Sequence, residues 1–259
     1  MKPLEGSHIA LTGAAGGLGS LLARRFWSAG ARITGIDRTE PEKCHAAIAA
    51  DLSDPEGLAG LADELASRRV DILVNVAGVQ YFGPIEEQGA DRLRLGYAVN
   101  LIAPAVLSAA VVPQMRLRGD GQIVNIGSMM GAVPYPYFTA YSSAKAGLKG
   151  FSQALRREVA GSGIAVTHVA PRAMRTPLNT EAIQRFMAAT KMHADDPDWV
   201  AGRILSAIER RAGDVSVGIA ERLFAQLNAI APRLIDRGIA GQVDAARALF
   251  RPSPTGAPS

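Results

Sequence analysis

The sequence predicts an α/β protein built on a doubly wound parallel sheet with helices on both faces. Short β-rich runs alternate with helical patterns along most of the 259 residues. These runs are continuously apolar rather than alternating, which is typical of strands buried on both faces. Helices between such strands favour parallel pairing, and ligands then bind at the carboxyl ends of the strands.

The elements follow one another in a regular order. In the first part of the chain we expect strands at 8–13, 31–37, 47–52 and 71–78, with helices near 17–29 and 55–68. In the second part we expect helices at 91–117, 140–160 and 197–211, strands at 122–128, 163–171 and 214–219, and a helical tail.

The length and the continuity of this pattern predict a single domain over residues 1–250. The pattern breaks at 172–197, a mixed polar and apolar segment long enough to form a lid over the ligand edge of the sheet. Residues 251–259, RPSPTGAPS, are expected to be a flexible tail.

Composition excludes several classes of function. The net charge of +4 comes from basic residues spread along the chain, so nucleic acid is not indicated. Cys44 is the single cysteine and the four histidines are scattered, so no metal site is predicted. The N-terminus lacks a signal-peptide pattern, and we expect a cytoplasmic protein. The uncharged stretch 95–115 is interrupted by polar residues and prolines, which favours a buried helix over a membrane span.

A glycine-rich turn joins the first strand to the first helix. It runs from Thr12 to Gly19, with glycines at 13, 16, 17 and 19. Such a turn points backbone N–H groups and a helix N-terminus at whatever lies above it, and glycine allows a pyrophosphate to approach closely. The turn therefore predicts a dinucleotide site.

Asp37 ends the second strand, 24 residues after Gly13. A carboxylate at this position can accept hydrogen bonds from the adenosine ribose and repel a 2'-phosphate, which favours NAD over NADP. Arg38 favours NADP instead, because its guanidinium could pair with the 2'-phosphate. NADP therefore stays open as the alternative cofactor.

Tyr141 and Lys145 are four residues apart in a helical stretch and project from one face. A positive charge beside a tyrosine favours the phenolate, which suits proton transfer near neutral pH. Ser128 ends a predicted strand at the expected ligand edge, where its hydroxyl can donate to a substrate oxygen. The three residues together predict an acid/base site.

Within residues 7 to 177 the chain carries an ordered set of motifs: Thr12 to Gly19, Asp51-Leu52, Asn75-Val76-Ala77-Gly78, Asn100, Ser128, Tyr141 and Lys145. This set resembles the short-chain dehydrogenase/reductase family, whose fold is Rossmann-like. The resemblance implies that Ser128 binds the reacting oxygen, Tyr141 is the acid/base and Lys145 holds the nicotinamide ribose and lowers the tyrosine pKa. Asn100 would keep a water in the proton path. The residues expected around the cofactor are Gly13, Gly16, Gly17, Leu18, Gly19, Asp37, Asp51, Leu52, Asn75, Ala77, Gly78, Tyr141, Lys145, Pro171 and Thr176. The resemblance also implies a homodimer or homotetramer built through the helices near 95–115 and 140–160.

Two positions depart from the family pattern. Val76 replaces the second asparagine of Asn-Asn-Ala-Gly, and Arg172 replaces the glycine of Pro-Gly. Three interpretations of Arg172 stay open: it binds the cofactor diphosphate, binds a substrate anion, or points to solvent.

Apolar side chains flank the predicted site and form a second group in the tail. The first group fits either an apolar substrate or lid packing: Met129, Met130, Val133, Tyr135, Tyr137, Phe138, Met174, Leu178, Phe186 and Met187. The tail group repeats at helical spacing and could cover substrate, pack on another subunit or touch a membrane: Leu223, Leu227, Ile230 and Leu234.

The sequence thus predicts hydride transfer between NAD(H) and a secondary alcohol or ketone, with an apolar or aromatic substrate. Two alternatives remain: an NADP-dependent reductase of 3-oxoacyl thioesters, and a non-catalytic NAD-binding sensor or scaffold on the same fold.

Overall fold

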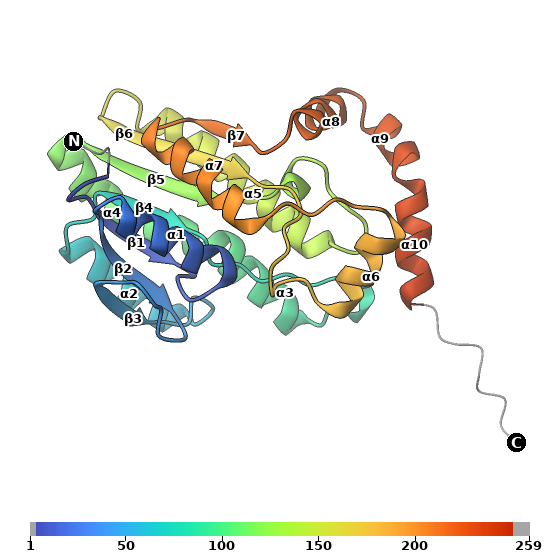
Figure 1. Cartoon of the computed structure of the whole chain (residues 1–259), viewed down its shortest axis with the longest axis horizontal. Coiled ribbons are helices and arrows are strands. Elements are labelled where there is room, and N and C mark those ends of the chain that lie inside the picture. The colour runs from blue at the N-terminus through green and yellow to red at the C-terminus, as the bar shows by residue number, and fades with distance from the viewer. Residues whose placement is uncertain (1–3, 251–259) are drawn as a thin grey trace, which may run out of the picture.

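In the computed structural model, which describes residues 4–250 without the side chains of 219–222, seven parallel strands form one sheet in the order β3-β2-β1-β4-β5-β6-β7 (Figure 1). The strands are β1 (His8–Thr12), β2 (Arg32–Asp37), β3 (Ala46–Ala49), β4 (Ile72–Asn75), β5 (Gly121–Ile126), β6 (Ile164–Ala170) and β7 (Asp214–Ser216). The chain runs outward from β1 to β3 and then returns to place β4 on the other side of β1. The switch point between β1 and β4 is where such sheets bind ligands.

Two apolar layers cover the sheet. On one face α1 (Gly17–Ser28) and α7 (Pro197–Glu209) pack together through buried residues that include Phe26 and Ile204. On the other face lie α2 (Pro55–Ser67), α4 (Ala103–Arg118) and α5 (Thr139–Glu158). The predicted doubly wound arrangement is therefore confirmed. β3, an edge strand, is mostly exposed, unlike the buried strand expected there.

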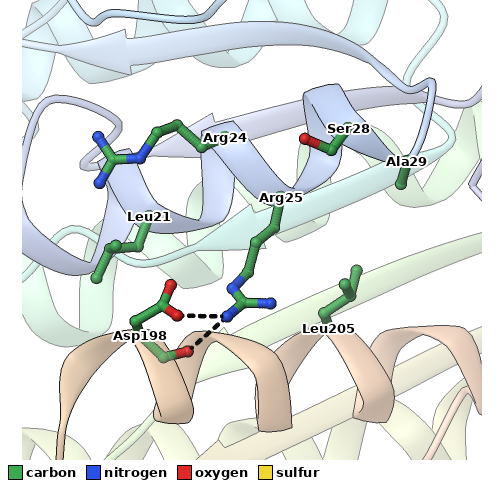
Figure 2. A pocket seen from close by; sticks show the side chains of 7 residues that line it. All are labelled: Leu21, Arg24, Arg25, Ser28, Ala29, Asp198 and Leu205. Carbon is green, nitrogen blue, oxygen red and sulfur yellow. Dashed lines mark hydrogen bonds and ion pairs between the residues drawn. The ribbon is translucent and has the colours of Figure 1, made fainter.

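A surface hollow of about 350 Å³ lies between α1 and α7 (Figure 2). Arg25 reaches across from α1 and donates to both the backbone oxygen (3.0 Å) and a carboxylate oxygen (2.7 Å) of Asp198. This ion pair ties the two helices of that layer together.

The helix expected at 91–117 consists of three consecutive segments. They are α3 (Ala90–Tyr97), a π-helical turn η2 (Ala98–Ile102) and α4. Among the described residues this is the one helix that is long and apolar enough to cross a membrane, with nearly half of its apolar window buried. Leu107, Val111 and Met115 are fully buried against the sheet layer, as in the core helix of a globular protein.

The remaining elements lie beyond the carboxyl ends of the strands or follow the sheet. Two short 3-10 turns are η1 (Ile85–Glu87) and η3 (Met129–Gly131). The lid segment contains α6 (Glu181–Ala189), and the tail forms α8 (Ile219–Ile230), α9 (Pro232–Gly238) and α10 (Ala240–Phe250). Figure 1 shows α10 beside α6 at one end of the molecule, away from strands β2 and β3. The predicted tail 251–259 lies outside the described residues.

Candidate active site

A cavity of about 520 Å³ opens at the carboxyl ends of the strands, over the β1–β4 switch point. Most residues predicted around the cofactor line it: Gly13, Gly16, Gly17, Leu18, Gly19, Asp37, Asp51, Leu52, Ala77, Gly78, Tyr141, Lys145 and Thr176. Asn75, Asn100, Ser128 and Pro171 do not line it. The structure thus brings the glycine-rich turn, Asp37, Tyr141 and Lys145 to one space.

The glycine-rich turn is shaped by close backbone contacts. Gly13 has a φ of 69°, and a Cβ there would lie 2.7 Å from the backbone nitrogen of Ala77. A Cβ on Gly19 would lie 1.9 Å from the Gly13 oxygen. Only glycine fits these two positions. α1 begins at Gly17 without an acidic residue in its first turn, and its first residues line the cavity, so its positive end faces this space.

Asp37 lies beside this turn. Its carboxylate accepts from the backbone N–H of Ala15 at 3.0 Å and from that of Arg38 at 2.7 Å. These bonds hold an anionic acceptor at the cavity wall next to the turn. The side chain of Arg38 lines the same cavity, so both groups considered for cofactor selection are present.

Asp51 and Leu52 also line the cavity. Asp51 accepts from the hydroxyl and the backbone N–H of Ser53, and these hydrogen bonds lower the pKa of its carboxyl. Asp51 is therefore an anion at neutral pH.

Asn75 and Pro171 support the site from behind the cavity wall. The Asn75 amide is buried and donates to Asn125 Oδ1 at 2.8 Å, which connects β4 to β5. The carbonyl of Pro171 accepts from the N–H of Met129 at 2.9 Å, next to Ser128. Their contacts in this structure are with protein groups rather than with the cavity.

Ser128, Tyr141 and Lys145 meet where β5 ends and α5 begins. Ser128 caps η3 by accepting from the N–H of Met130 at 3.1 Å, and its side chain is near enough to Tyr141 to influence the pKa of that phenol. Lys145 donates to the carbonyl of Ile126 at 2.9 Å, and its Nζ lies 5.8 Å from the centroid of the Tyr141 ring. The structure thus brings Ser128 and Lys145 close to the side chain of Tyr141.

The electrostatics of the pair differ from the expectation. Burial raises the pKa of Tyr141, and the neighbouring Ser128 side chain opposes this rise. Burial also lowers the pKa of Lys145 to about 8. The net shift of the tyrosine pKa is therefore upward, opposite to the lowering expected from Lys145, because desolvation of the phenolate outweighs other influences.

Asn100 lies in the π-helical turn η2 and is fully buried. Its amide nitrogen donates to the carbonyls of Val79 (2.8 Å) and Gly96 (2.9 Å). Its Oδ1 has no hydrogen-bond partner among the described residues and lies 3.0 Å from where a Cβ on Gly78 would be. An unpaired buried acceptor beside the cavity wall is the kind of group that the predicted water role requires, although that role stays a prediction.

Arg172 adopts an arrangement that the sequence analysis did not consider. Its guanidinium binds Asp195 through two hydrogen bonds, Nε to Oδ2 at 2.9 Å and Nη2 to Oδ1 at 2.5 Å. Asp195 is only 5% exposed at its side chain. An isolated bridge pairs Met174 with Asp195, so the two ends of the lid are joined at its base. Arg172 is thus a lid contact, not a residue that simply points to solvent.

The lid reaches the glycine-rich turn. A Cβ on Gly17 would lie 3.1 Å from Cδ of Pro177 and 3.7 Å from Cβ of Thr176. Glycine at position 17 therefore permits this approach of the lid, which places Thr176 in the cavity wall.

The apolar residues near the site divide into two groups. Phe138 and Phe186 are fully buried and stack or tilt against Phe82, at 4.6 Å and 5.0 Å between ring centroids. For these two residues the lid-packing interpretation is correct. Met174 and Leu178 instead line the cavity.

Sequence reasoning missed several cavity residues, including Leu95 and Val99 from the helix that carries Asn100. Their i, i+4 spacing, with Asn100 adjacent to Val99, was a usable signal. The tail residues Leu223, Leu227, Ile230 and Leu234 are exposed, so the three interpretations of that stripe stay open. Residues 4–250 contain no group of three or more His, Cys, Asp or Glu suited to a metal ion.

Known proteins match both the sequence and the structure. The profile of the short chain dehydrogenase family matches residues 7–185. Dehydrogenase/reductase SDR family member 7B from Bos taurus is 31% identical, over 90% of this chain and 80% of its own length. A short-chain dehydrogenase from Sphingobium yanoikuyae, solved with NADPH, superposes with a TM-score of 0.76 at 29% identity, over 89% of this chain and 96% of the other.

A second solved structure is the bulky-bulky ketone specific alcohol dehydrogenase from Comamonas testosteroni. It has a TM-score of 0.73 at 28% identity and covers 89% of this chain and 94% of its own. The match of the family profile, the parallel sheet and the motif order agree. The chain belongs to the short-chain dehydrogenase/reductase family and is an oxidoreductase of that family.

Proposed function

We propose that the protein transfers hydride between NAD(H) and a secondary alcohol or ketone with apolar substituents. The observation that carries the proposal is that Tyr141 and Lys145 line the same cavity as the glycine-rich turn and Asp37, with Ser128 close to Tyr141. Bound NAD would supply the hydride acceptor, and its reduced form the hydride donor.

The residues present fit a dinucleotide. The positive end of α1 and the tight turn at Gly13 and Gly19 suit a diphosphate, and the fixed carboxylate of Asp37 suits ribose hydroxyls. In oxidation, Ser128 would donate to the substrate oxygen while the Tyr141 phenolate takes the hydroxyl proton. Lys145 would hold the ribose and keep a positive charge beside the phenolate. Leu95, Val99, Met174 and Leu178 give the cavity an apolar wall.

The alternative is an NADP-dependent reductase of 3-oxoacyl thioesters. Arg38 supports it, because its side chain lines the cavity next to Asp37, and the relative from Sphingobium yanoikuyae holds NADPH. The catalytic groups would be the same, so the two functions differ in cofactor and in substrate.

Titration with NADH and NADPH, followed by a screen of apolar secondary alcohols, ketones and a 3-oxoacyl thioester, separates the possibilities. We expect tighter binding of NADH and turnover of an apolar alcohol or ketone. Preference for NADPH with turnover of the thioester would establish the alternative. Binding of dinucleotide without turnover of any of these compounds would favour the sensor or scaffold.

We also propose a cytoplasmic homodimer or homotetramer. Exposed Ile102 and Leu117 on the helix at 90–118 support an assembly through that helix. Sedimentation as a monomer at micromolar concentration would contradict it.

A further inference from the structure

A row of polar residues crosses the sheet beneath the cavity, close to the carboxyl ends of the strands. Thr12, Asn75, Asn125, His168 and Asp214 are direct neighbours on β1, β4, β5, β6 and β7. All except Asp214 are buried. Polar side chains in such a layer are costly unless they are held in defined contacts. The row therefore requires an explanation at each position.

The three residues of the row on β1, β4 and β5 form hydrogen bonds. Thr12 Oγ1 accepts from the N–H groups of Val76 and Ala77, and Asn75 bonds Asn125. His168, which is 2% exposed, is not used by the acid/base chemistry described above.

The surroundings of His168 define the state of its ring. Its Nδ1 lies 3.6 Å from Oδ1 of Asp214, and Arg156 donates to the same carboxylate at 2.7 Å. Burial lowers the pKa of His168 to about 4, and the positive charges of Lys145, Lys149 and Arg156 act in the same direction. The ring is therefore neutral at physiological pH.

The other edge of the ring faces Gly127. A Cβ on Gly127 would lie 2.2 Å from Nε2 and 2.8 Å from Cε1 of His168. The imidazole thus occupies the space of a side chain at position 127. Nε2 itself has no hydrogen-bond partner among the described residues. The contact is therefore one of shape, between the ring and a bare backbone.

Gly127 lies between two groups of the active site. The residue before it, Ile126, provides the carbonyl that accepts from Lys145 at 2.9 Å, and the residue after it is Ser128. The N–H of Gly127 donates to the carbonyl of Val169 at 2.7 Å, which fixes this segment to β6. Any shift at Gly127 is transmitted to Ser128.

We propose that His168 is a positioning residue that fixes the backbone at Gly127 and thereby sets the place of the Ser128 hydroxyl. Because Ser128 acts on the substrate oxygen only in the proposed reaction, the kinetic part of this inference rests on the proposed function. The structural part, that ring and glycine fit each other, does not.

The test is a double-mutant cycle of Gly127→Ala and His168→Ala. Gly127→Ala should clash with the ring, displace Ser128 and lower kcat about 100-fold, with the KM for the dinucleotide changed less than about threefold. His168→Ala should lower kcat about tenfold, because the segment loses its support. The double variant should recover at least about tenfold over Gly127→Ala, because the smaller side chain makes room for the new methyl group.

Thr167→Val is the matched control. Thr167 is as buried as His168 and is its neighbour on β6, but it hydrogen-bonds Gln122 on the other face of the sheet. This variant should lose thermal stability and keep kcat within about twofold. A comparable loss of kcat in Thr167→Val, or losses in the double variant that are the product of the single losses, would overturn the proposal.

Crystal structures of Gly127→Ala and of the double variant provide a readout that needs no substrate. Ser128 Oγ should move by about 1 Å in the single variant and return in the double. An unmoved Ser128 in Gly127→Ala refutes the positioning role. Absence of turnover in the natural protein together with the expected movements refutes the proposed function alone.

Discussion

The nucleotide side of the cavity and the lid side are built in different ways. Residues 12–19 and 75–78 meet through backbone contacts that tolerate only glycine or small residues, such as Gly13 against Ala77. The lid and the last helices are held by side chains far apart in sequence, such as Arg172 with Asp195 and Phe250 with Tyr137. The first kind of contact leaves a motif in the sequence, and the second does not.

The largest effect is expected for Tyr141→Phe, which should reduce turnover without reducing dinucleotide binding. Tyr141→Phe should lower kcat about 10³-fold, because the acid/base group is lost, while dinucleotide affinity changes little. Steady-state kinetics and a binding titration check this. Tyr135→Phe is the control: Tyr135 is partly buried, does not line the cavity, and its loss should leave kcat within about threefold. Full activity of Tyr141→Phe on a confirmed substrate would contradict the mechanism.

The pH dependence of the free energy of unfolding tests whether His168 is buried as a neutral side chain. The pKa of His168 in the folded protein, about 4, lies below its ordinary value of 6.5. The unfolded chain therefore binds the proton more readily, and this contribution to stability is full above pH 6.5 and lost as pH falls to 4. The loss should be about 3 kcal/mol. Denaturant unfolding of the natural protein and of His168→Gln should show a flatter pH dependence in the variant over this range. Equal slopes would mean that His168 is not buried as described.

The lid side should be sensitive at its base. Arg172→Ala leaves the carboxylate of Asp195 buried without its main partner, and we expect a loss of about 2 kcal/mol, less than for a fully buried pair because Arg172 is 27% exposed. Denaturant unfolding measures it. Arg185→Ala removes an exposed pair with Glu181 on α6 and should cost less than about 0.5 kcal/mol. Equal losses in the two variants would show that the lid base is not a special contact.

A substitution on the nucleotide side of the cavity should change the selectivity between NADH and NADPH rather than the stability of the protein. Asp37→Asn keeps the shape and removes the negative charge, so the ratio of NADH to NADPH affinity should fall about tenfold, which corresponds to about 1.4 kcal/mol. Competitive titration of both dinucleotides measures the ratio. An unchanged ratio would assign cofactor selection to Arg38 or to other groups.

The parts that could be predicted from the sequence are those with a local pattern. The periodicity of strands and helices was sufficient to predict the parallel sheet. The motifs at Gly13, Asp37, Tyr141 and Lys145 were sufficient to predict that these residues meet in one cavity. The strand expected at 71–78 ends at Asn75, because the backbone beyond it turns to bond Thr12.

What could not be predicted depends on partners with no local signal. Asn125 is 50 residues from Asn75, and Asp195 is 23 residues from Arg172. The upward shift of the Tyr141 pKa is set by burial, which spacing along a helix does not report. His168 looked like one scattered histidine because its fit to Gly127 exists only once β5 and β6 lie side by side.

The π-helical turn at 98–102 restricts which deletions this segment of the chain can tolerate. A π turn holds one residue more than an α turn, so deletion of a single residue there would restore a regular α-helix. Each residue of an α-helix rotates the direction of the following side chains by about 100°, so the deletion would swing Leu95 and the rest of α3 away from the cavity relative to α4. Natural variants of this segment should therefore keep its length even where they exchange its side chains.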